Sequence, residues 1–279
     1  MSLSTDSVWV DGTLANSVPA DDRGLNLADG VFETLRVEEG KVALANSHRD
    51  RLGRGLKLLA FSEPDEQAEN ALKLAVDALN EALPNATGSL RVTVTRGSGP
   101  RGYAPPDNPQ IRVISRFARG LPVAAKPARA AISPIFWAEQ PQFAGAKLLA
   151  RTEQVMALNW AKQAGYDDAV MTTADGRCIS TASGNIFCRQ GQDLFTPRLT
   201  SCGIAGTRRR AIVDYWAQAL GYTVAQTDIT VDQLDSFDEV FSCNAIQGVR
   251  SLAAIDAFTF GDHSAALALA PCIHGEYPL

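Results

Sequence analysis

Alternating hydrophobic and polar positions predict β-hairpins near the amino terminus. Residues 7–15 (SVWVDGTLA) alternate on both sides of Asp11-Gly12, and residues 33–45 (ETLRVEEGKVALA) alternate about Glu39-Gly40. A glycine-containing pair between two alternating runs is typical of a tight hairpin turn. The same alternation predicts two further strands, at residues 89–97 (SLRVTVTRG) and 111–117 (IRVISRF).

Between these runs the hydrophobic period lengthens to that of a helix. Leu52, Leu56 and Leu59 recur at helical spacing after Ser47, which we expect to cap the helix. A second helix is predicted over residues 65–83, because Pro84 ends its pattern.

A change of composition divides the chain. Residues 116–127 (RFARGLPVAAKP) lose periodicity and gain glycine and proline, which predicts a linker between domains 1–119 and 120–279. Beyond it we expect a helix ending near Ala164 and a second helix from about Gly206. Short β segments are expected at residues 130–137 (AAISPIFW), 167–173 (DDAVMTT), 184–191 (GNIFCRQG), 194–197 (LFTP) and 238–249 (DEVFSCNAIQGV).

The helix from Gly206 is predicted to bury one stripe of side chains, made by Ile212, Tyr215, Trp216 and Leu220. Hairpins and helices mix along the chain without regular βαβ alternation. No GxGxxG opens a helix after the first strand, and there is no Walker A loop. The pattern therefore predicts an α+β chain in two lobes and disfavours the two common nucleotide-binding folds.

Composition narrows the function classes. The chain has 279 residues, 46% hydrophobic and 20% charged, which is enough for two globular cores. Its formal charge of −5 gives no general attraction for nucleic acid or anionic lipid, so a phosphate site has to be local. No apolar run approaches the roughly 18 residues that span a bilayer. The first residues, MSLSTDSVWVDG, do not resemble a secretory signal, and we expect a cytoplasmic protein without a membrane partner.

Cysteine and histidine usage disfavours a metal centre. The five cysteines are scattered without CxxC spacing, and there are only three histidines. Neither a disulfide framework, a zinc site nor a Ser/His/Asp triad is therefore expected. We predict no metal ligands.

Three stretches suggest chemistry with an anionic ligand. In residues 143–158 (FAGAKLLARTEQVMAL), Lys147 lies among small and apolar residues where a helix begins; a lysine in such a place ordinarily extends along the surface. Residues 203–212 (GIAGTRRRAI) place a glycine-containing turn before a helix, whose first N–H groups attract anions. Residues 96–106 (RGSGPRGYAPP) carry Arg96, Arg101 and Tyr103, which suit a substrate carboxylate; the alternative is a polar hairpin loop.

Taken together, these stretches resemble a known family. The motifs are RGLNLADGVFETLRV (23–37), HRDRL (48–52), RGSGPRGY (96–103), AGAKLLARTEQV (144–155), GNIF (184–187), GIAGTRRRAI (203–212) and VFSCNA (240–245). In this order and spacing they resemble the fold-type IV, class IV aminotransferase family of pyridoxal-phosphate enzymes over nearly the whole chain. Within it, the 96–103 and 144–155 motifs look most like the lyases of 4-amino-4-deoxychorismate.

The resemblance implies the fold and a cofactor site. It implies two lobes, a smaller N-terminal α/β lobe and a larger C-terminal lobe with a β-barrel-like core. Lys147 matches the lysine that bonds covalently to pyridoxal 5'-phosphate, and Arg51 matches the arginine that grips its phosphate. The backbone N–H groups that bind the same phosphate are matched by Gly206, Thr207 and Arg208.

The resemblance also implies residues on the substrate side. Arg101 and Tyr103 match residues that hold a substrate carboxylate, in the same subunit or in its neighbour. Asn244, with Ala245, stands where relatives often place a hydroxyl near the phosphate. Small neighbours let a cofactor approach Lys147, and a partly dry pocket favours the uncharged, nucleophilic form of its amine.

One position departs from the family pattern. Relatives usually carry a glutamate five residues before the asparagine of the GNIF segment, where it keeps the pyridine nitrogen protonated. Counting back from Asn185 gives Ser180. A hydroxyl does not supply a negative charge, so the ring is expected to be a weaker electron sink. Because elimination depends on that sink less than transamination does, Ser180 favours a lyase.

The expected function is therefore a pyridoxal-phosphate-dependent lyase that releases pyruvate from 4-amino-4-deoxychorismate to give 4-aminobenzoate, a folate precursor. Its partner is a small amine and carboxylate substrate, and the resemblance implies a homodimer. The alternatives are a branched-chain or D-amino-acid aminotransferase of the same family and a non-catalytic pyridoxal-phosphate-binding protein. A phosphate-binding protein without pyridoxal is the fourth possibility.

Overall fold

The computed structural model describes residues 6–15, 17–122 and 126–272, arranged in two compact units. The N-terminal unit comprises Met1–Leu121 and also Ala146–Ala150; the C-terminal unit comprises Pro122–Gly145 and Arg151–Leu279. The sequence had suggested a division between residues 119 and 120. Of the predicted linker, residues 123–125 lie outside the described residues.

The N-terminal unit contains a six-stranded sheet within the described residues, in the order β2-β1-β6-β5-β3-β4 with antiparallel neighbours throughout. Its strands are β1 (Asp6–Val10), β2 (Thr13–Leu14), β3 (Gly30–Glu38), β4 (Lys41–Val42), β5 (Gly88–Thr95) and β6 (Arg112–Arg119). Both predicted hairpins are confirmed. Asp11 and Glu39 and the glycines after them adopt positive φ, as the tight turn of a two-residue hairpin requires.

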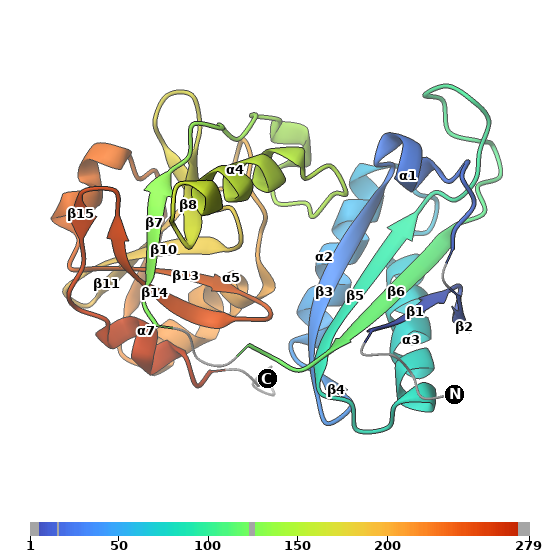
Figure 1. Cartoon of the computed structure of the whole chain (residues 1–279), viewed down its shortest axis with the longest axis horizontal. Coiled ribbons are helices and arrows are strands. Elements are labelled where there is room, and N and C mark those ends of the chain that lie inside the picture. The colour runs from blue at the N-terminus through green and yellow to red at the C-terminus, as the bar shows by residue number, and fades with distance from the viewer. Residues whose placement is uncertain (1–5, 16, 123–125, 273–279) are drawn as a thin grey trace. The chain divides into compact units, whose positions relative to one another are not determined.

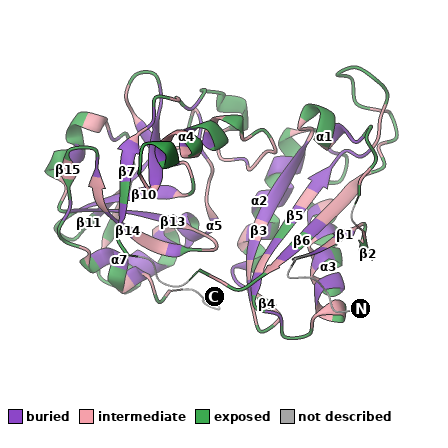
Figure 2. Cartoon of the chain, viewed as in Figure 1, coloured by how far each residue is buried: buried purple, intermediate pink, exposed green. Residues whose placement is uncertain are grey.

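Helices α2 and α3 cover one face of this sheet (Figure 1). The helices of the unit are α1 (Arg23–Leu27), α2 (Ala45–Leu58) and α3 (Pro64–Ala82). Buried aliphatic side chains lie between them and the strands, among them Leu35, Leu56 and Leu79. Figure 2 shows the buried stretches of these helices and strands. The prediction that Ser47 caps α2 is wrong, because the left-handed Leu44 turns the chain into the helix earlier.

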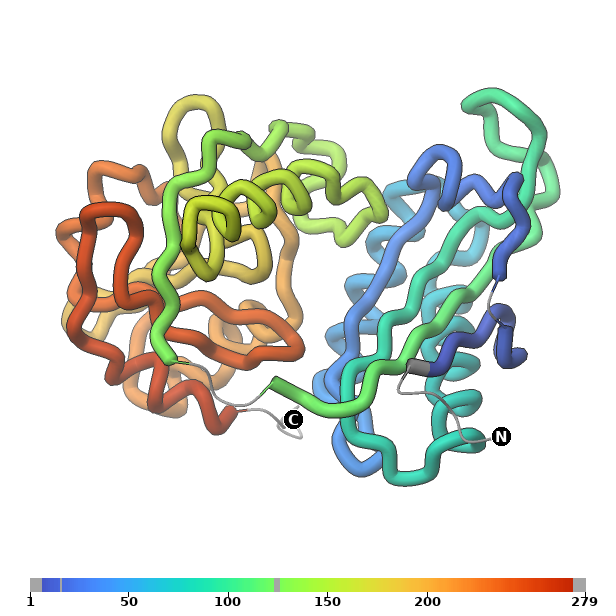
Figure 3. The backbone as a smooth tube through the Cα atoms, viewed as in Figure 1, coloured from blue at the N-terminus to red at the C-terminus, as the bar shows by residue number. Residues whose placement is uncertain are grey.

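The C-terminal unit contains a mixed sheet of nine strands within the described residues. Its order is β12-β11-β10-β13-β14-β7-β8-β9, and β15 pairs with β14. The sheet curls into a half-barrel, so that its strands cross one another steeply (Figures 1 and 3). The strands are β7 (Ala128–Ile132), β8 (Asp168–Thr172), β9 (Cys178–Thr181), β10 (Asn185–Gln190), β11 (Asp193–Pro197), β12 (Thr223–Thr227), β13 (Glu239–Asn244), β14 (Gly248–Ile255) and β15 (Phe258–Thr259).

The strand predicted at residues 130–137 is shifted. β7 begins at Ala128 and ends at Ile132, because Pro134 cannot donate to a ladder. The Ser133 hydroxyl accepts from the N–H of Ile135 at 2.9 Å and turns the chain there. Trp137 then returns beside β8, where its N–H donates to the Thr172 carbonyl at 2.8 Å.

Helical segments pack on the curled sheet. They are η1 (Pro141–Phe143), α4 (Thr152–Gln163), α5 (Thr207–Ala211), η2 (Ile212–Trp216), α6 (Ala217–Ala219), η3 (Val231–Ser236) and α7 (Ser264–Leu269). α5, η2 and α6 form one continuous helix whose middle is π-helical. The predicted buried stripe is half right: Ile212 and Trp216 are buried, whereas Tyr215 and Leu220 are exposed. A π-helical turn places residues four and five apart on one face, which moves Tyr215 out of the stripe.

Candidate active site

Lys147 lies in a short segment that extends the N-terminal sheet. The Phe32 N–H donates to the Lys147 carbonyl at 3.0 Å, and the Leu149 N–H donates to the Gly30 carbonyl at 3.1 Å. The half-buried Lys147 side chain places its Nζ 4.4 Å from the centre of the Phe32 ring. Strand-like pairing with β3 therefore fixes the backbone that carries the predicted nucleophile.

The chain reaches this segment from a ladder within the C-terminal unit. The Gly145 N–H donates to the Gly203 carbonyl at 2.9 Å, and the Ala205 N–H donates to the Gly145 carbonyl at 3.0 Å. Gly145 has φ +82, a left-handed conformation that favours glycine. These two bonds tie the backbone two residues before Lys147 to the turn that precedes the helix at Thr207.

That helix begins without a side-chain cap. Its N-cap residue is Gly206, and a side chain there has no room, because a Cβ would lie 2.0 Å from Asn185 Oδ1. Asn185 Nδ2 donates to the Ile204 carbonyl at 2.8 Å. Asn185 thus holds the turn before the helix start, a role that the sequence analysis missed although the GNIF motif contained the residue.

The three arginines of this helix differ. Arg208 is buried and donates to the carbonyls of Asn244 at 2.9 Å and Cys272 at 2.7 Å. Arg209 is buried as well, with its guanidinium at Thr196, Pro197 and Gln226. Arg210 is exposed and pairs with Asp214 four residues on. Since Arg208 and Arg209 tie the helix to the sheet, an anion at the helix start would meet backbone N–H groups.

Arg51 belongs to a buried trio with Glu33 and His48. Its Nε donates to Glu33 Oε1 at 2.7 Å, and its Nη2 contacts the other carboxylate oxygen. His48 Nδ1 lies 2.6 Å from that second oxygen. The bidentate contact fixes the plane of the Arg51 guanidinium. Glu33 and His48 were not among the predicted site residues, since nothing in their spacing indicates that a strand residue and a helix residue meet.

Electrostatics fixes the protonation of the trio. Burial by itself raises the pKa of Glu33, but the charge of Arg51 and the hydrogen bonds with Arg51 and His48 outweigh it and lower the pKa to about 2. Burial lowers the pKa of His48, against the attraction of Glu33, and the charges of Arg51 and Lys147 lower it further. At neutral pH, Glu33 is therefore ionised, and a neutral His48 donates its Nδ1–H to Glu33.

The predicted carboxylate-binding residues separate into two kinds. Arg96 is buried: its Nε donates to Asp29 at 2.9 Å, its Nη2 donates to the Leu59 carbonyl at 2.5 Å, and its guanidinium lies over the Phe61 ring. Its side chain therefore forms part of the packed interior of the N-terminal unit. Arg101 is exposed, and Tyr103 is 89% exposed.

Ser180 lies on β9, opposite Met171 of β8. The side chain is buried, and its Oγ has no hydrogen-bond partner among the described residues. A buried hydroxyl without a partner costs about 1 to 3 kcal/mol, which a hydrogen bond from a bound group would offset. The atom thus fits a ligand contact at the position where the family pattern expects one.

Asn244 organises a turn. Its Oδ1 accepts from the N–H groups of Ile246 at 3.0 Å and Gln247 at 2.7 Å, and its Nδ2 donates to the Ser183 carbonyl at 3.2 Å. Ala245 is the half-buried first residue of that turn. Because the Asn244 carbonyl accepts from Arg208, the C-terminal unit brings two of the predicted site positions together.

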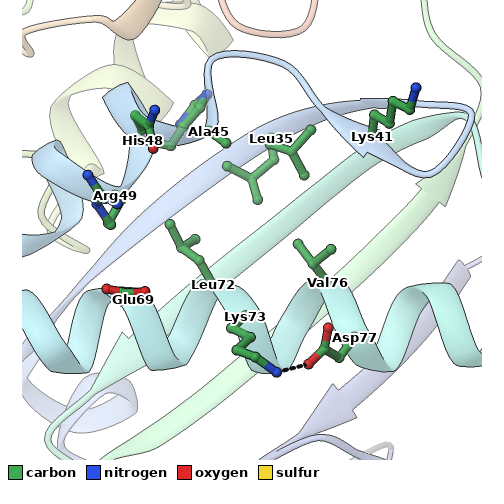
Figure 4. A pocket seen from close by; sticks show the side chains of 12 residues that line it. Leu35, Lys41, Ala45, His48, Arg49, Glu69, Leu72, Lys73, Val76 and Asp77 are labelled. Carbon is green, nitrogen blue, oxygen red and sulfur yellow. Dashed lines mark hydrogen bonds and ion pairs between the residues drawn. The ribbon is translucent and has the colours of Figure 1, made fainter.

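The N-terminal unit also has a cavity of about 420 Å³ beside α2 and α3 (Figure 4). Leu35, Val42, Leu72 and Val76 form its apolar wall, and the ion pair of Lys73 and Asp77 lies at its edge. Its lining includes His48 but none of the residues predicted to bind cofactor or substrate.

Two further findings concern metal ions and membranes. Among the described residues, no three His, Cys, Asp or Glu side chains gather closely enough to hold a metal ion. Nor does the described part of the chain contain a helix with the length and apolar character to cross a membrane.

Comparisons with known proteins agree on one family. The model of the amino-transferase class IV family matches residues 30–255. An aminodeoxychorismate lyase of Vibrio harveyi is 30% identical, covering 89% of this chain and 91% of that protein. A D-alanine aminotransferase of Listeria innocua is 26% identical over 88% of this chain and 85% of its own length. The crystal structure of 4-amino-4-deoxychorismate lyase from Pseudomonas aeruginosa has a TM-score of 0.84 at 30% identity, covering 98% of this chain and 100% of that one.

Proposed function

The chain belongs to the class IV aminotransferase family, whose members bind pyridoxal phosphate, and from this premise we propose that it is a lyase of 4-amino-4-deoxychorismate. The products are 4-aminobenzoate and pyruvate. The observation that carries the proposal is the 30% identity to two lyases over nearly the full length, against 26% to a D-alanine aminotransferase and 28%, over 79% of the chain, to a putative branched-chain aminotransferase.

The residues of the chain fit the cofactor. Ser180 offers a buried hydroxyl that lacks a partner among the described residues, and the helix at Gly206 begins without a side-chain cap. In the proposal, the Ser180 hydroxyl would hold the pyridine ring through a hydrogen bond. Arg51, held in one plane by Glu33, would bind the phosphate. The N–H groups of the helix start are the second group proposed to bind it. Asn244 and Ala245 border that helix start, because the Asn244 carbonyl accepts from Arg208.

When bound, pyridoxal phosphate withdraws electrons from the substrate carbon that bears the amine. Lys147 Nζ takes the proton from that carbon, a step that typically contributes about 10²- to 10⁴-fold in rate. The C–O bond to the enolpyruvyl group on the adjacent carbon then breaks, and the ring becomes aromatic. The released enol gains a proton at carbon and becomes pyruvate. Arg101 and Tyr103 hold the substrate carboxylate.

Two measurements test this proposal. The purified protein, incubated with pyridoxal phosphate, is expected to show a visible absorbance band and to form 4-aminobenzoate and pyruvate in equal amounts from 4-amino-4-deoxychorismate. Lys147→Ala is expected to lose both the covalently bound cofactor and turnover, because no other described amine occupies that place. Normal turnover in this variant would exclude Lys147 as the nucleophile.

The similarity to a D-alanine aminotransferase supports a second candidate, an aminotransferase of D-amino or branched-chain acids. Incubation with amino donors and 2-oxo acids separates the two activities. Sustained amino exchange without pyruvate release from 4-amino-4-deoxychorismate would favour the aminotransferase. A coloured protein that turns over neither substrate would favour a non-catalytic binding protein.

We also propose that the protein is a homodimer. Tyr103 is a large aromatic side chain with 89% of its surface exposed, as expected of a residue that a second copy covers or uses. Light scattering after size-exclusion chromatography measures the mass directly. A monomeric mass of 29.8 kDa at micromolar concentration would exclude the dimer.

A further inference from the structure

The loop that joins β5 to β6 has to present Arg101 and Tyr103 at a defined place if they bind substrate. It runs outside helices and strands and projects beyond the ends of both strands (Figure 1). Neither side chain is buried in the unit. Since a binding group placed 1 Å away from its proper position loses most of its effect, the loop needs fixed points along its backbone.

Arg23 supplies such a point. Its Nη1 donates to the carbonyls of Gly102 at 3.2 Å and Ala104 at 3.1 Å, and its Nη2 donates to the Tyr103 carbonyl at 2.9 Å. One planar guanidinium thus binds three consecutive carbonyls. This fixes the direction of the backbone on both sides of Tyr103 and next to Arg101.

Arg23 is itself immobilised. Its Nε donates to Asp29 at 2.8 Å, and Arg96 donates to the same carboxylate oxygen at 2.9 Å. Burial raises the pKa of Asp29, but Arg96 and Arg23 outweigh burial and lower it, so the carboxylate is ionised at neutral pH. The Arg23 side chain is only 5% exposed.

The loop is also shaped to receive the arginine. The Arg23 backbone N–H donates to the Gly97 carbonyl at 2.8 Å. Gly99 lies against the arginine stem, so that a Cβ at this glycine would meet Arg23 Cδ at 2.9 Å. A side chain at residue 99 would therefore push the guanidinium away from its carbonyls.

We propose that Arg23 is a positioning residue that holds the backbone of residues 102–104 and thereby sets the affinity of Arg101 and Tyr103 for the substrate carboxylate. The inference rests on the proposed function of these two side chains. A lysine in place of Arg23 offers a single ammonium, which does not reach three carbonyls in a fixed plane.

The test is Arg23→Lys in the holoenzyme. We expect KM to rise about tenfold while kcat stays within about twofold, because the variant weakens binding without touching the reacting atoms. Hydrogen exchange of the amides of residues 101–104 is expected to become faster, with or without cofactor. Arg112→Lys is the matched control: Arg112 contacts Asp22 at 3.1 Å in the same unit but none of the three carbonyls, and this variant is expected to resemble the parent.

A second variant acts from the loop side and keeps Arg23. Gly99→Ala is expected to raise KM and loop exchange as Arg23→Lys does, and the two effects should not add in the double variant. It also serves as the test if Arg23→Lys fails to fold. Two results would overturn the proposal. One is a folded Gly99→Ala or Arg23→Lys variant whose loop amides exchange hydrogen at the wild-type rate, and the other is a raised KM without faster hydrogen exchange.

Arg101→Ala separates this inference from the proposed function. One outcome is that Arg101→Ala raises KM while Arg23→Lys and Gly99→Ala leave both KM and the hydrogen exchange of the loop unchanged. In that case the loop binds substrate and Arg23 does not position it. If Arg101→Ala leaves KM unchanged, the loop has no part in substrate binding; faster exchange in Arg23→Lys would still support the backbone contact with Arg23.

Discussion

Glu33 is the residue on which the position of Arg51 depends. Glu33→Gln removes the charge opposite a buried guanidinium, and breaking such a pair costs about 3 to 5 kcal/mol. Denaturant unfolding at pH 7 measures the loss. Glu38→Gln, on a half-buried carboxylate paired with Arg36, is the control and is expected to cost less than about 1 kcal/mol.

The same variant has a defined pH dependence. The pKa of Glu33 is lowered from 4.5 to about 2 on folding, so its stabilisation is complete above pH 4.5 and disappears as the pH falls towards 2. We therefore expect the difference in unfolding free energy between the parent and Glu33→Gln to narrow over this window. A difference that stays constant from pH 7 to 2 would mean that Glu33 is not the group that titrates.

Ser180→Ala should affect stability and cofactor binding in opposite directions. Removal of a hydroxyl that lacks a described partner leaves the cofactor-free protein as stable as the parent, or up to about 1 kcal/mol more stable. The Kd for pyridoxal phosphate is expected to rise about two- to tenfold. Thermal unfolding without cofactor and a binding titration measure the two effects.

The control for Ser180→Ala is the next residue. The Thr181 hydroxyl accepts from the Gly184 N–H at 3.0 Å, so Thr181→Val should cost about 1 kcal/mol without cofactor. An equal loss of stability in Ser180→Ala would mean that its hydroxyl has a structural partner instead of a ligand.

At the scale of elements, the helix that begins at Thr207 depends on the absence of a side chain before it. A Cβ at Gly206 would displace the Asn185 amide and with it the Ile204 carbonyl. Gly206→Ala is therefore expected to weaken cofactor binding by at least about tenfold, since the N–H groups of the helix start move. Gly261→Ala, at a glycine with open space around its Cα, should leave the Kd unchanged.

Elements with local determinants were predictable from the sequence. The conformation of the turn alone specifies the two hairpins, at Asp11-Gly12 and Glu39-Gly40. Hydrophobic and polar residues alternate along β5 and β6 because one face of the sheet is buried. The π-helical turn at Ile212–Trp216 was not predictable, because the hydrophobic pattern was interpreted with the spacing of an α-helix and a π-helix has more residues per turn. Family resemblance, not periodicity, provided the half-barrel fold, and the solved lyase structure confirms it.

The candidate site was predictable only where a residue belongs to a motif. Lys147 and Gly206 are proposed as site residues in this way. Arg96 was assigned to substrate from its loop, although burial against Asp29 and Leu59 occupies its side chain. Glu33 and Asn185 act through partners far away in the sequence, and a single sequence does not reveal such pairs.

At the scale of the whole molecule, the N-terminal unit is not one continuous stretch. Ala146–Ala150 belongs to it and pairs with the Gly30 end of β3, which is otherwise an unpaired edge at that point of the described sheet. A fragment of residues 1–121 is therefore expected to unfold at a lower temperature than the same fragment joined to residues 146–150 by a flexible linker. Circular dichroism measures both, and a Gly/Ser segment of equal length in place of residues 146–150 is the control.

The pairing of residues 147–149 with β3 has a consequence for synthesis on the ribosome. The β3 edge emerges early, but the backbone that completes it is made more than a hundred residues later, after β7 of the other unit has been made. Until then, a nascent chain exposes unsatisfied amide and carbonyl groups beside Gly30, which another chain can capture. Chaperone protection during translation would matter most over this interval and much less after residue 150 has emerged.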